Sequence, residues 1–328
     1  MATQPMTTQR TPTAAGVARA DAKLRAILPP TPLLPATIRG TEVFLKAESL
    51  QPIGAFKIRG AWHRLSDLNA EEAARGVVGV SSGNHAQGVA WAAARLGIAA
   101  AIVMPVDAPR VKLERTRSLG AEVVLYDRPA GEDRDAVAAR LVAERGATLV
   151  HAYADPWVIE GQGSAALEAA RQLAGRGLPA PTRFVTCCGG GGLTAGIALA
   201  CPDADVVPVE PEGWDDVARS LAAGAIVPVA DLSYPTACDA LQTPATRPIN
   251  FAVLQTRCPF GLMVTPAEVR AAQRYAFAEH RLVLEPGGAA ALAAALAGKA
   301  ALDGTTVITL SGGNTDAAAF AQVLASAD

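Results

Sequence analysis

Residues 184–192 read Phe-Val-Thr-Cys-Cys-Gly-Gly-Gly-Gly, so a short apolar run leads directly into four consecutive glycines. The run 184–187 is predicted to be a buried strand, and 194–200 has the apolar spacing of a helix. Without side chains, the four glycine N–H groups can converge on an anion at the start of that helix. A flexible turn is the alternative, but ordering four glycines for no ligand costs much conformational entropy. We therefore expect a phosphate-binding loop.

The same alternation of strands and helices extends outward on both sides. Between 77 and 151, predicted strands at 77–80, 99–104, 122–126 and 148–151 alternate with helices at 84–96, 109–119 and 134–144. Further strands are expected at 43–45, 206–209 and 306–310, and further helices at 14–28, 58–68, 156–173, 266–280 and 287–296. Residues 213–262 contain many prolines and read as irregular. This pattern is typical of α/β proteins with parallel sheets covered by helices.

The predicted organisation has two domains. Residues 1–76 and 152–328 form the large one, and residues 77–151 are a smaller insertion.

Composition excludes several classes of function. The chain has 328 residues, half of them hydrophobic, and a net charge of −2 with no basic face, which argues against nucleic acid as a partner. The apolar runs are too short to span a membrane. Five cysteines without a C-x-x-C pair fit free thiols in the cytoplasm.

A second stretch, Gly-Ala-Phe-Lys-Ile-Arg-Gly-Ala at 54–61, places Lys57 at a turn-to-helix junction. A lysine in this position can hold an aldehyde cofactor as a Schiff base. A solvated lysine in the first turn of a surface helix is the common alternative.

Two further loops follow predicted strands. Ser-Ser-Gly-Asn-His at 81–85 offers hydroxyls and the free N–H groups of a helix start, which suit a carboxylate, although a simple N-cap is the alternative. Ser-Gly-Gly-Asn at 311–314 ends the last strand, where a serine hydroxyl can bond to a pyridine nitrogen. The acidic loop at 210–216 either binds a divalent cation or is solvated.

These motifs, together with Glu-Pro-Gly-Gly at 285–288, occur in an order and spacing that resemble one family. From about Leu24 to Asn314 the chain resembles the fold-type II, tryptophan synthase β-like, pyridoxal-phosphate (PLP) enzymes. Within them it is most similar to the branch of serine/threonine dehydratases and serine racemases.

The resemblance implies a role for each matching residue. Lys57 would hold PLP and act as the base at Cα, and Ser82 would face Cα from the opposite side, as in racemases. The implied cofactor-binding residues are Phe56, Lys57, Asn84, Gly189, Gly190, Gly191, Gly192 and Ser311. The implied substrate-binding residues are Ser81, Asn84, His85 and Arg134, the last facing a distal carboxylate. Glu210, Asp216 and the carbonyl of Trp214 would bind Mg²⁺, Ca²⁺ or Mn²⁺.

The implied function is PLP-dependent dehydration and deamination of threonine or serine to a 2-oxo acid and ammonia, in a homodimer. A 3-hydroxyaspartate dehydratase, an amino-acid racemase and a non-catalytic module that binds an anion or nucleotide are the alternatives. The chain departs from the family at Ala55, where serine is usual, and at 238–242, where a glycine is expected. The second departure leaves the substrate open.

Overall fold

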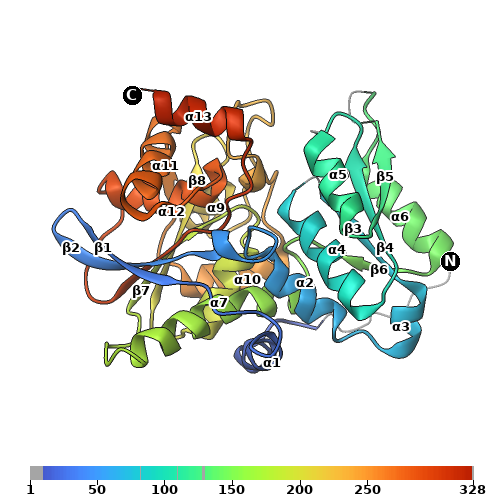
Figure 1. The fold of residues 1–328 in the computed structure, drawn as a ribbon, viewed down its shortest axis with the longest axis horizontal. Helices are drawn as coiled ribbons and strands as arrows, with labels where there is room; N and C mark the ends of the chain where they lie inside the picture. Colours follow the sequence, from blue (N-terminus) through green and yellow to red (C-terminus); the bar gives the residue numbers. More distant parts are fainter. Residues whose placement is uncertain (1–9, 82, 109, 128–129, 327–328) are drawn as a thin grey trace.

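The computed structural model describes residues 10–81, 83–108, 110–127 and 130–326, which form two sheets flanked by helices (Figure 1). The larger sheet has the strand order β1-β2-β10-β7-β8-β9, and the smaller has the order β5-β4-β3-β6. Every pairing is parallel except that of β1 with β2. The predicted α/β class with parallel sheets is confirmed.

The large sheet contains β1 (Leu33–Ile38), β2 (Thr41–Lys46), β7 (Arg183–Cys187), β8 (Asp205–Pro211), β9 (Leu262–Val264) and β10 (Thr306–Thr309). The small sheet contains β3 (Val77–Val80), β4 (Ala100–Pro105), β5 (Glu122–Tyr126) and β6 (Thr148–Val150). The helices up to the end of the small sheet are α1 (Ala14–Leu24), α2 (Lys57–Leu65), α3 (Ala70–Arg75), α4 (Asn84–Leu96), α5 (Arg110–Ser118) and α6 (Arg134–Arg145). The later ones are α7 (Pro156–Ala174), α8 (Gly192–Ala200), α9 (Asp216–Ala223), α10 (Pro248–Arg257), α11 (Pro266–His280), α12 (Pro286–Leu296) and α13 (Ala317–Ala325). Two short 3₁₀ turns, η1 (Glu48–Leu50) and η2 (Asp239–Leu241), complete the elements.

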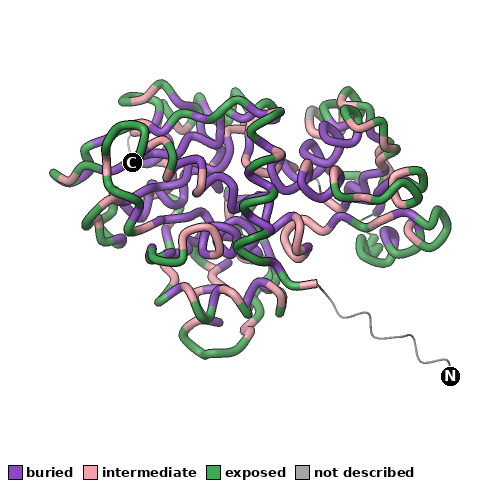
Figure 2. Tube along the Cα trace, turned by 90° about the horizontal axis from the view of Figure 1, so that it is seen from below, coloured by how far each residue is buried: buried purple, intermediate pink, exposed green. Residues whose placement is uncertain are grey.

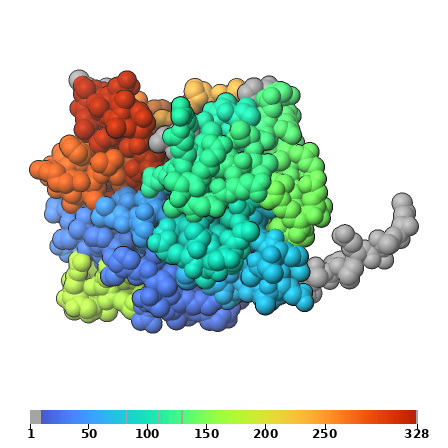
Figure 3. Space-filling model, turned by 45° about the vertical axis from the view of Figure 1, so that its right-hand side comes forward, coloured from blue at the N-terminus to red at the C-terminus, as the bar shows by residue number. Residues whose placement is uncertain are grey.

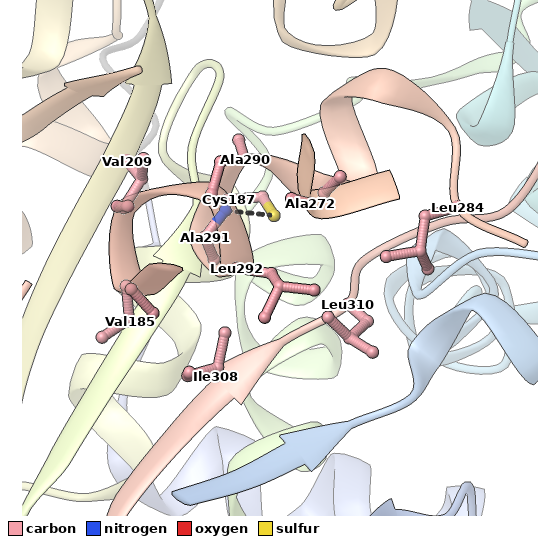
Figure 4. Packing of buried hydrophobic residues seen from close by; sticks show 14 of the residues in the cluster. Val185, Cys187, Val209, Ala272, Leu284, Ala290, Ala291, Leu292, Ile308 and Leu310 are labelled. Carbon is pink, nitrogen blue, oxygen red and sulfur yellow. Dashed lines mark hydrogen bonds between the residues drawn. The ribbon is translucent and has the colours of Figure 1, made fainter. Parts of the chain in front are cut away.

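Successive side chains along each strand of the large sheet point to opposite faces of the sheet. Val185 packs in a core with α11 and α12, whereas Phe184 packs in a second core with α7 and α8. Figure 4 shows the first core, in which Leu292 of α12 lies close to Ile308 of β10. The buried residues therefore lie in the interior, between the sheets and the helices, and the exposed residues lie on the outside (Figure 2).

The small sheet is covered in the same way. One face packs against α4 and α2, and the other against α6. Because Ile53, Ile58 and Ala61 share a core with the small sheet, the start of α2 lies between the two sheets. Figure 3 shows the small-sheet region (cyan to green) against the N-terminal segments (blue).

Close backbone contact brings two distant loops together at one end of the large sheet. A Cβ built on Gly288, in the first turn of α12, would lie 2.1 Å from the carbonyl oxygen of Gly312. Only glycine permits this approach. It places Glu285 beside the segment that follows β10.

A buried network of charges fixes the start of α2. Arg59 donates to Glu48 at 2.7 and 2.8 Å and to Glu168 of α7 at 3.0 Å. Lys46 of β2 donates to the other Glu168 oxygen at 2.5 Å. Burial alone raises the pKa of Glu48, but the charges of Arg59 and Lys46 lower it to about 2. The network therefore holds β2, η1, α2 and α7 in one arrangement.

Several sequence predictions differ from the structure. The segment 213–262, predicted to be irregular, contains α9 and α10, and α10 begins at Pro248, a residue that suits the first helical position. The first helix ends at Leu24 and not at 28. Strand β1 was not predicted because Pro35 interrupts its pattern, and proline is tolerated there since β1 is an edge strand. The domain boundaries at 77 and 151 stay a prediction.

No helix among the described residues is long and apolar enough to cross a membrane.

We predict that Arg59→Met lowers the free energy of unfolding by about 3–5 kcal/mol, because Glu48 stays buried without its main counter-charge. Arg25→Met is the matched control, since the Arg25 side chain is 58% exposed and its ion pair with Asp21 spans 3.5 Å. That variant should change stability by about 0.5 kcal/mol or less. Denaturant titration measures both, and equal effects would contradict the assigned role of the network.

Candidate active site

A cavity of about 770 Å³ lies between the two sheets, where the carboxyl ends of their central strands meet the starts of several helices. Its wall includes the start of α2, the start of α4, the glycine loop between β7 and α8, and the loop after β10. The predicted residues that line it are Phe56, Lys57, Ser81, Asn84, His85, Arg134, Gly189, Gly190, Gly191, Gly192 and Ser311. Ser82 lies outside the described residues. The structure thus brings together four sequence motifs from distant parts of the chain.

Lys57 differs from the other lysines of the chain in its partners. Each of the other four, Lys23, Lys46, Lys112 and Lys299, forms an ion pair with a carboxylate. Among the described residues, Lys57 has no such pair, and its Nζ donates to the carbonyl oxygen of Ala152 at 2.7 Å. Burial lowers the pKa of Lys57 to about 8, although the nearby Glu285 carboxylate opposes the shift. A neutral amine is therefore far more accessible here than on an exposed lysine.

The glycine loop has the properties of an anion-binding site. Gly191 has a φ of 87° and is the N-cap of α8. Within the described part of the chain, the N–H groups of Gly189 to Gly192 have no hydrogen-bond acceptor. The back of the loop is closely packed, because a Cβ on Gly190 would lie 2.3 Å from the ring of Tyr153. The free N–H groups and the helix start together favour a phosphate.

Asn84 connects two other loops of the site. Its amide nitrogen donates to Glu285 at 2.6 Å, and its oxygen accepts from Asn314 at 2.7 Å. Burial, together with the charge of Asp239, raises the pKa of Glu285 to about 8. Glu285 therefore changes its charge in the same pH range as Lys57. Glu285 belongs to the motif at 285–288, but no role was predicted for it from the sequence.

The start of α4 presents backbone donors to the cavity. The Oγ of Ser81 accepts from the N–H of Gly83 at 3.1 Å, which fixes the loop. The imidazole of His85 is held against β6, since its Nε2 lies 2.8 Å from the carbonyl oxygen of Val150. Burial and the Lys57 charge lower the pKa of His85 to about 3, so its ring is neutral. Any carboxylate here would meet the backbone N–H groups of the first helical turn, not the imidazole.

Ser311 and the residues before Lys57 are held together. The N–H of Phe56 donates to the carbonyl oxygen of Ser311 at 3.1 Å, and Ala55 forms an isolated antiparallel bridge with Gly312. Ala55 is completely buried, so the departure from serine leaves the backbone pairing in place. The ring centroid of Phe56 lies 5.2 Å from the Lys57 amine.

The acidic loop lies outside this cavity. Both oxygens of Glu210 accept from backbone N–H groups of α9, those of Val217 and Ala218. One oxygen of Asp216 accepts from Thr246 at 2.6 Å, and the other has no partner among the described residues. Burial raises the pKa of both carboxyls, and each is close enough to affect the other. No group of three or more His, Cys, Asp or Glu residues suited to a metal occurs in the described ranges.

His151, Tyr153, Arg247 and Glu285, for which the sequence predicted no role, are among the other residues that line the cavity. Glu285 carried a signal, because it belongs to one of the quoted motifs. The other three carried none that could be read from local sequence, since each reaches the cavity only through the packing of distant segments.

The residues fit PLP. The cofactor needs an amine, an anion-binding loop and a partner for its ring nitrogen. Lys57, the unpaired N–H groups of the glycine loop and the Ser311 hydroxyl provide these on the walls of one cavity.

Comparisons with known proteins agree with this fit. A family model described as "Pyridoxal-phosphate dependent enzyme" matches residues 25–313. The chain is 37% identical over 322 residues to serine racemase of Schizosaccharomyces pombe, which covers 95% of this chain and 97% of that protein. It is 40% identical over 290 residues to L-threo-3-hydroxyaspartate ammonia-lyase of Pseudomonas sp, covering 87% of this chain and 88% of that protein. The solved structure of maize serine racemase matches with a TM-score of 0.88 at 32% identity, covering 96% of this chain and 98% of that one.

The resemblance stated from the motifs is thus confirmed, and so is the expectation of an enzyme. The chain belongs to the family of pyridoxal-phosphate-dependent enzymes.

Proposed function

We propose that this enzyme eliminates water from a 2-amino-3-hydroxy acid such as threonine or serine, and that hydrolysis of the resulting enamine takes up one water and releases ammonia and a 2-oxo acid. The observation that carries the proposal is the position of Lys57. Its amine, free of any carboxylate partner in the described structure, shares a cavity with the glycine loop and the start of α4. These three features provide a proton acceptor, a cofactor anchor and a binding site for the substrate α-carboxylate.

The bound cofactor would supply an electron sink that acidifies the Cα–H bond of the amino acid. Lys57 accepts that Cα proton, and the α-carboxylate is held by the N–H groups at the start of α4 beside Ser81. The electron pair of the Cα–H bond forms the Cα–Cβ double bond as the Cβ–O bond breaks. The hydroxyl takes up the proton held on Lys57 and leaves as water. Hydrolysis of the released enamine then consumes one water and gives the oxo acid and ammonia. Ser311 offers a neutral hydroxyl, so no charged partner holds the ring nitrogen protonated.

Racemisation is the second candidate, because the relative from Schizosaccharomyces pombe is a serine racemase. It needs a proton donor opposite Lys57, and Ser82 is the residue that we propose for this role.

We further propose a homodimer, and a reducing compartment such as the cytoplasm, which suits the five free cysteines.

We predict that the purified protein is yellow with PLP and that Lys57→Ala abolishes the Schiff-base absorbance. Release of oxo acid from threonine or serine should fall by roughly 10²–10⁴-fold or more, since the variant lacks the base. Lys299→Ala is the control, because Lys299 pairs with Glu268 outside the cavity. A colourless wild-type protein that does not respond to added PLP would overturn the proposal.

The lowered pKa of Lys57 predicts the pH range in which its amine reacts with an aldehyde. Only the neutral amine attacks an aldehyde, so the rate of PLP attachment to the cofactor-free protein should rise with pH and reach half its maximum near pH 8, not near the ordinary 10.5. Glu285→Gln should move this midpoint lower, because the carboxylate charge raises the pKa of Lys57. Stopped-flow absorbance measures both. A midpoint near 10 in the wild type would contradict the buried environment.

A divalent cation fits the acidic loop in one respect: it would satisfy the unpartnered oxygen of Asp216 and reduce the repulsion between Asp216 and Glu210. We propose Mg²⁺ there, with the Trp214 carbonyl as a third ligand. The cation should raise the unfolding free energy by about 2.7 kcal/mol at a hundredfold excess over its Kd. Thermal melting with EDTA and then Mg²⁺ tests this, with Asp216→Asn as the non-responding variant. Identical melting curves in EDTA and Mg²⁺ would remove the site.

A further inference from the structure

The orientation of the glycine loop is not fixed by its own residues. A trans peptide unit carries its N–H and its carbonyl oxygen on opposite sides, so the N–H groups serve an anion only while they point into the cavity. Glycine adopts both signs of φ, and a peptide unit between two glycines can therefore turn over at little steric cost. If the unit between Gly190 and Gly191 turned over, the carbonyl oxygen of Gly190 would face the anion in place of the N–H of Gly191.

Thr246 holds this peptide unit in one orientation. Its Oγ donates to the carbonyl oxygen of Gly190 at 3.2 Å. Thr246 is 2% exposed and lies behind the loop, since Gly190 and Gly191 line the cavity and Thr246 does not. Because the carbonyl of Gly190 points back to Thr246, the N–H of Gly191 points the other way, toward the cavity.

Thr246 is itself fixed through its backbone. Its N–H donates to one carboxylate oxygen of Asp216 at 2.6 Å. Asp216 is the first residue of α9 and is 1% exposed, so its side chain has little freedom to move. Two consecutive hydrogen bonds, from Thr246 to Asp216 and from Thr246 to Gly190, thus connect the acidic loop to the glycine loop.

The first turn of α10 supports the same loop at a second point. The amide nitrogen of Asn250 donates to the carbonyl oxygen of Tyr153 at 2.8 Å. Tyr153 packs closely behind the loop, because a Cβ on Gly190 would lie 2.3 Å from its ring and one on Gly192 would lie 3.0 Å from its Cβ. Packing of this kind restrains the position of the loop, whereas the directional hydrogen bond of Thr246 selects the orientation of the peptide unit.

We propose that Thr246 is a positioning residue for the cofactor phosphate: its hydroxyl keeps the N–H of Gly191 directed into the cavity, and Asp216 keeps that hydroxyl in place. Thr246 acts through the glycine loop and takes no part in proton transfer. The proposal goes beyond the proposed elimination, since it concerns the affinity for a phosphate group, whichever reaction the enzyme catalyses.

The test is the affinity of the cofactor-free protein for PLP, measured by absorbance titration in EDTA so that no cation occupies the acidic loop. Thr246→Val keeps the shape of the side chain but leaves the buried carbonyl of Gly190 without its donor. We expect the Kd for PLP to rise about 3- to 10-fold, the effect of losing one neutral hydrogen bond. Thr246→Ser keeps a hydroxyl and should restore most of the affinity.

Thr256→Val is the matched control. Thr256 lies in the same helix, α10, is exposed, and its hydroxyl bonds to the carbonyl oxygen of Val253 in that helix at 2.9 Å. The substitution is chemically identical to Thr246→Val but does not touch the glycine loop, so it should leave the Kd for PLP unchanged.

Pyridoxal separates a positioning role from a merely structural one, because it has the ring and aldehyde of PLP but no phosphate. Thr246→Val should leave the Kd for pyridoxal unchanged, so that the ratio of the pyridoxal Kd to the PLP Kd falls about 3- to 10-fold. Inorganic phosphate probes the loop without the ring. The concentration of phosphate that half-inhibits PLP attachment should rise in Thr246→Val.

A second pair of variants tests the bond to Asp216. Asp216→Ala removes the acceptor of the Thr246 N–H, whereas Asp216→Asn keeps an oxygen that can accept. In EDTA, Asp216→Ala should weaken PLP and Asp216→Asn should not. The effects of Asp216→Ala and Thr246→Val should not add in the double variant, because both act through the same hydroxyl. Additive effects would remove Asp216 from the assignment.

Two results would overturn the role of Thr246. PLP affinity could be unchanged in Thr246→Val, which would show that the loop keeps its orientation without the hydroxyl. Pyridoxal and PLP could instead be weakened equally, which would make Thr246 a structural residue of the fold. Either result would leave the proposed elimination intact, whereas failure of every hydroxy amino acid to yield oxo acid would overturn the proposed function and leave the phosphate measurements standing.

Discussion

The buried contact between Arg59 and the two carboxylates of Glu48 and Glu168 is the constraint on which the site depends. All three side chains are almost completely removed from water, so any arrangement that separates them leaves an uncompensated buried charge. Arg59 lies two residues after Lys57, in the first turn of α2. The requirement to keep the ion network intact therefore also fixes where the reactive amine enters the cavity.

Small residues allow the rest of the site to assemble around that point. A Cβ on Gly161 of α7 would lie 2.5 Å from the Cα of Gly60, and one on Gly288 would meet the carbonyl of Gly312. The first contact brings α7 against α2, and the second brings Glu285 against the loop of Ser311. The alanine- and glycine-rich composition is thus connected to function: it lets the backbone segments that carry the chemistry approach closely.

Much of this could be predicted from sequence, because the informative features were local. The strand-glycine-helix pattern at 184–200 predicted both the parallel sheet and the anion loop, and Lys57 was found from its place at a helix start. The missed elements depended on tertiary context. Helix α10 was not predicted because prolines flank it in the sequence. Strand β1 was not predicted because it contains Pro35, which a strand accepts only at the edge of a sheet.

The cavity residues that were not predicted from the sequence were missed for the same reason, because their position depends on tertiary packing. Arg247 and His151 are distant in sequence from every glycine motif. They share a cavity with Lys57 only because the fold brings the two sheets together. The side chain of His85 shows the converse: its position at the start of α4 was readable from sequence. That its ring turns toward the Val150 carbonyl depends on the pairing of β3 with β6.

We infer that Lys57 is the one lysine that carries the cofactor. The chain contains five lysines, at 23, 46, 57, 112 and 299. The most direct measurement is borohydride reduction of the PLP-loaded protein, followed by proteolysis and mass spectrometry to locate the pyridoxyl group. We expect a single modification, on the peptide that contains Lys57. A modification on another lysine, or none at all, would contradict it.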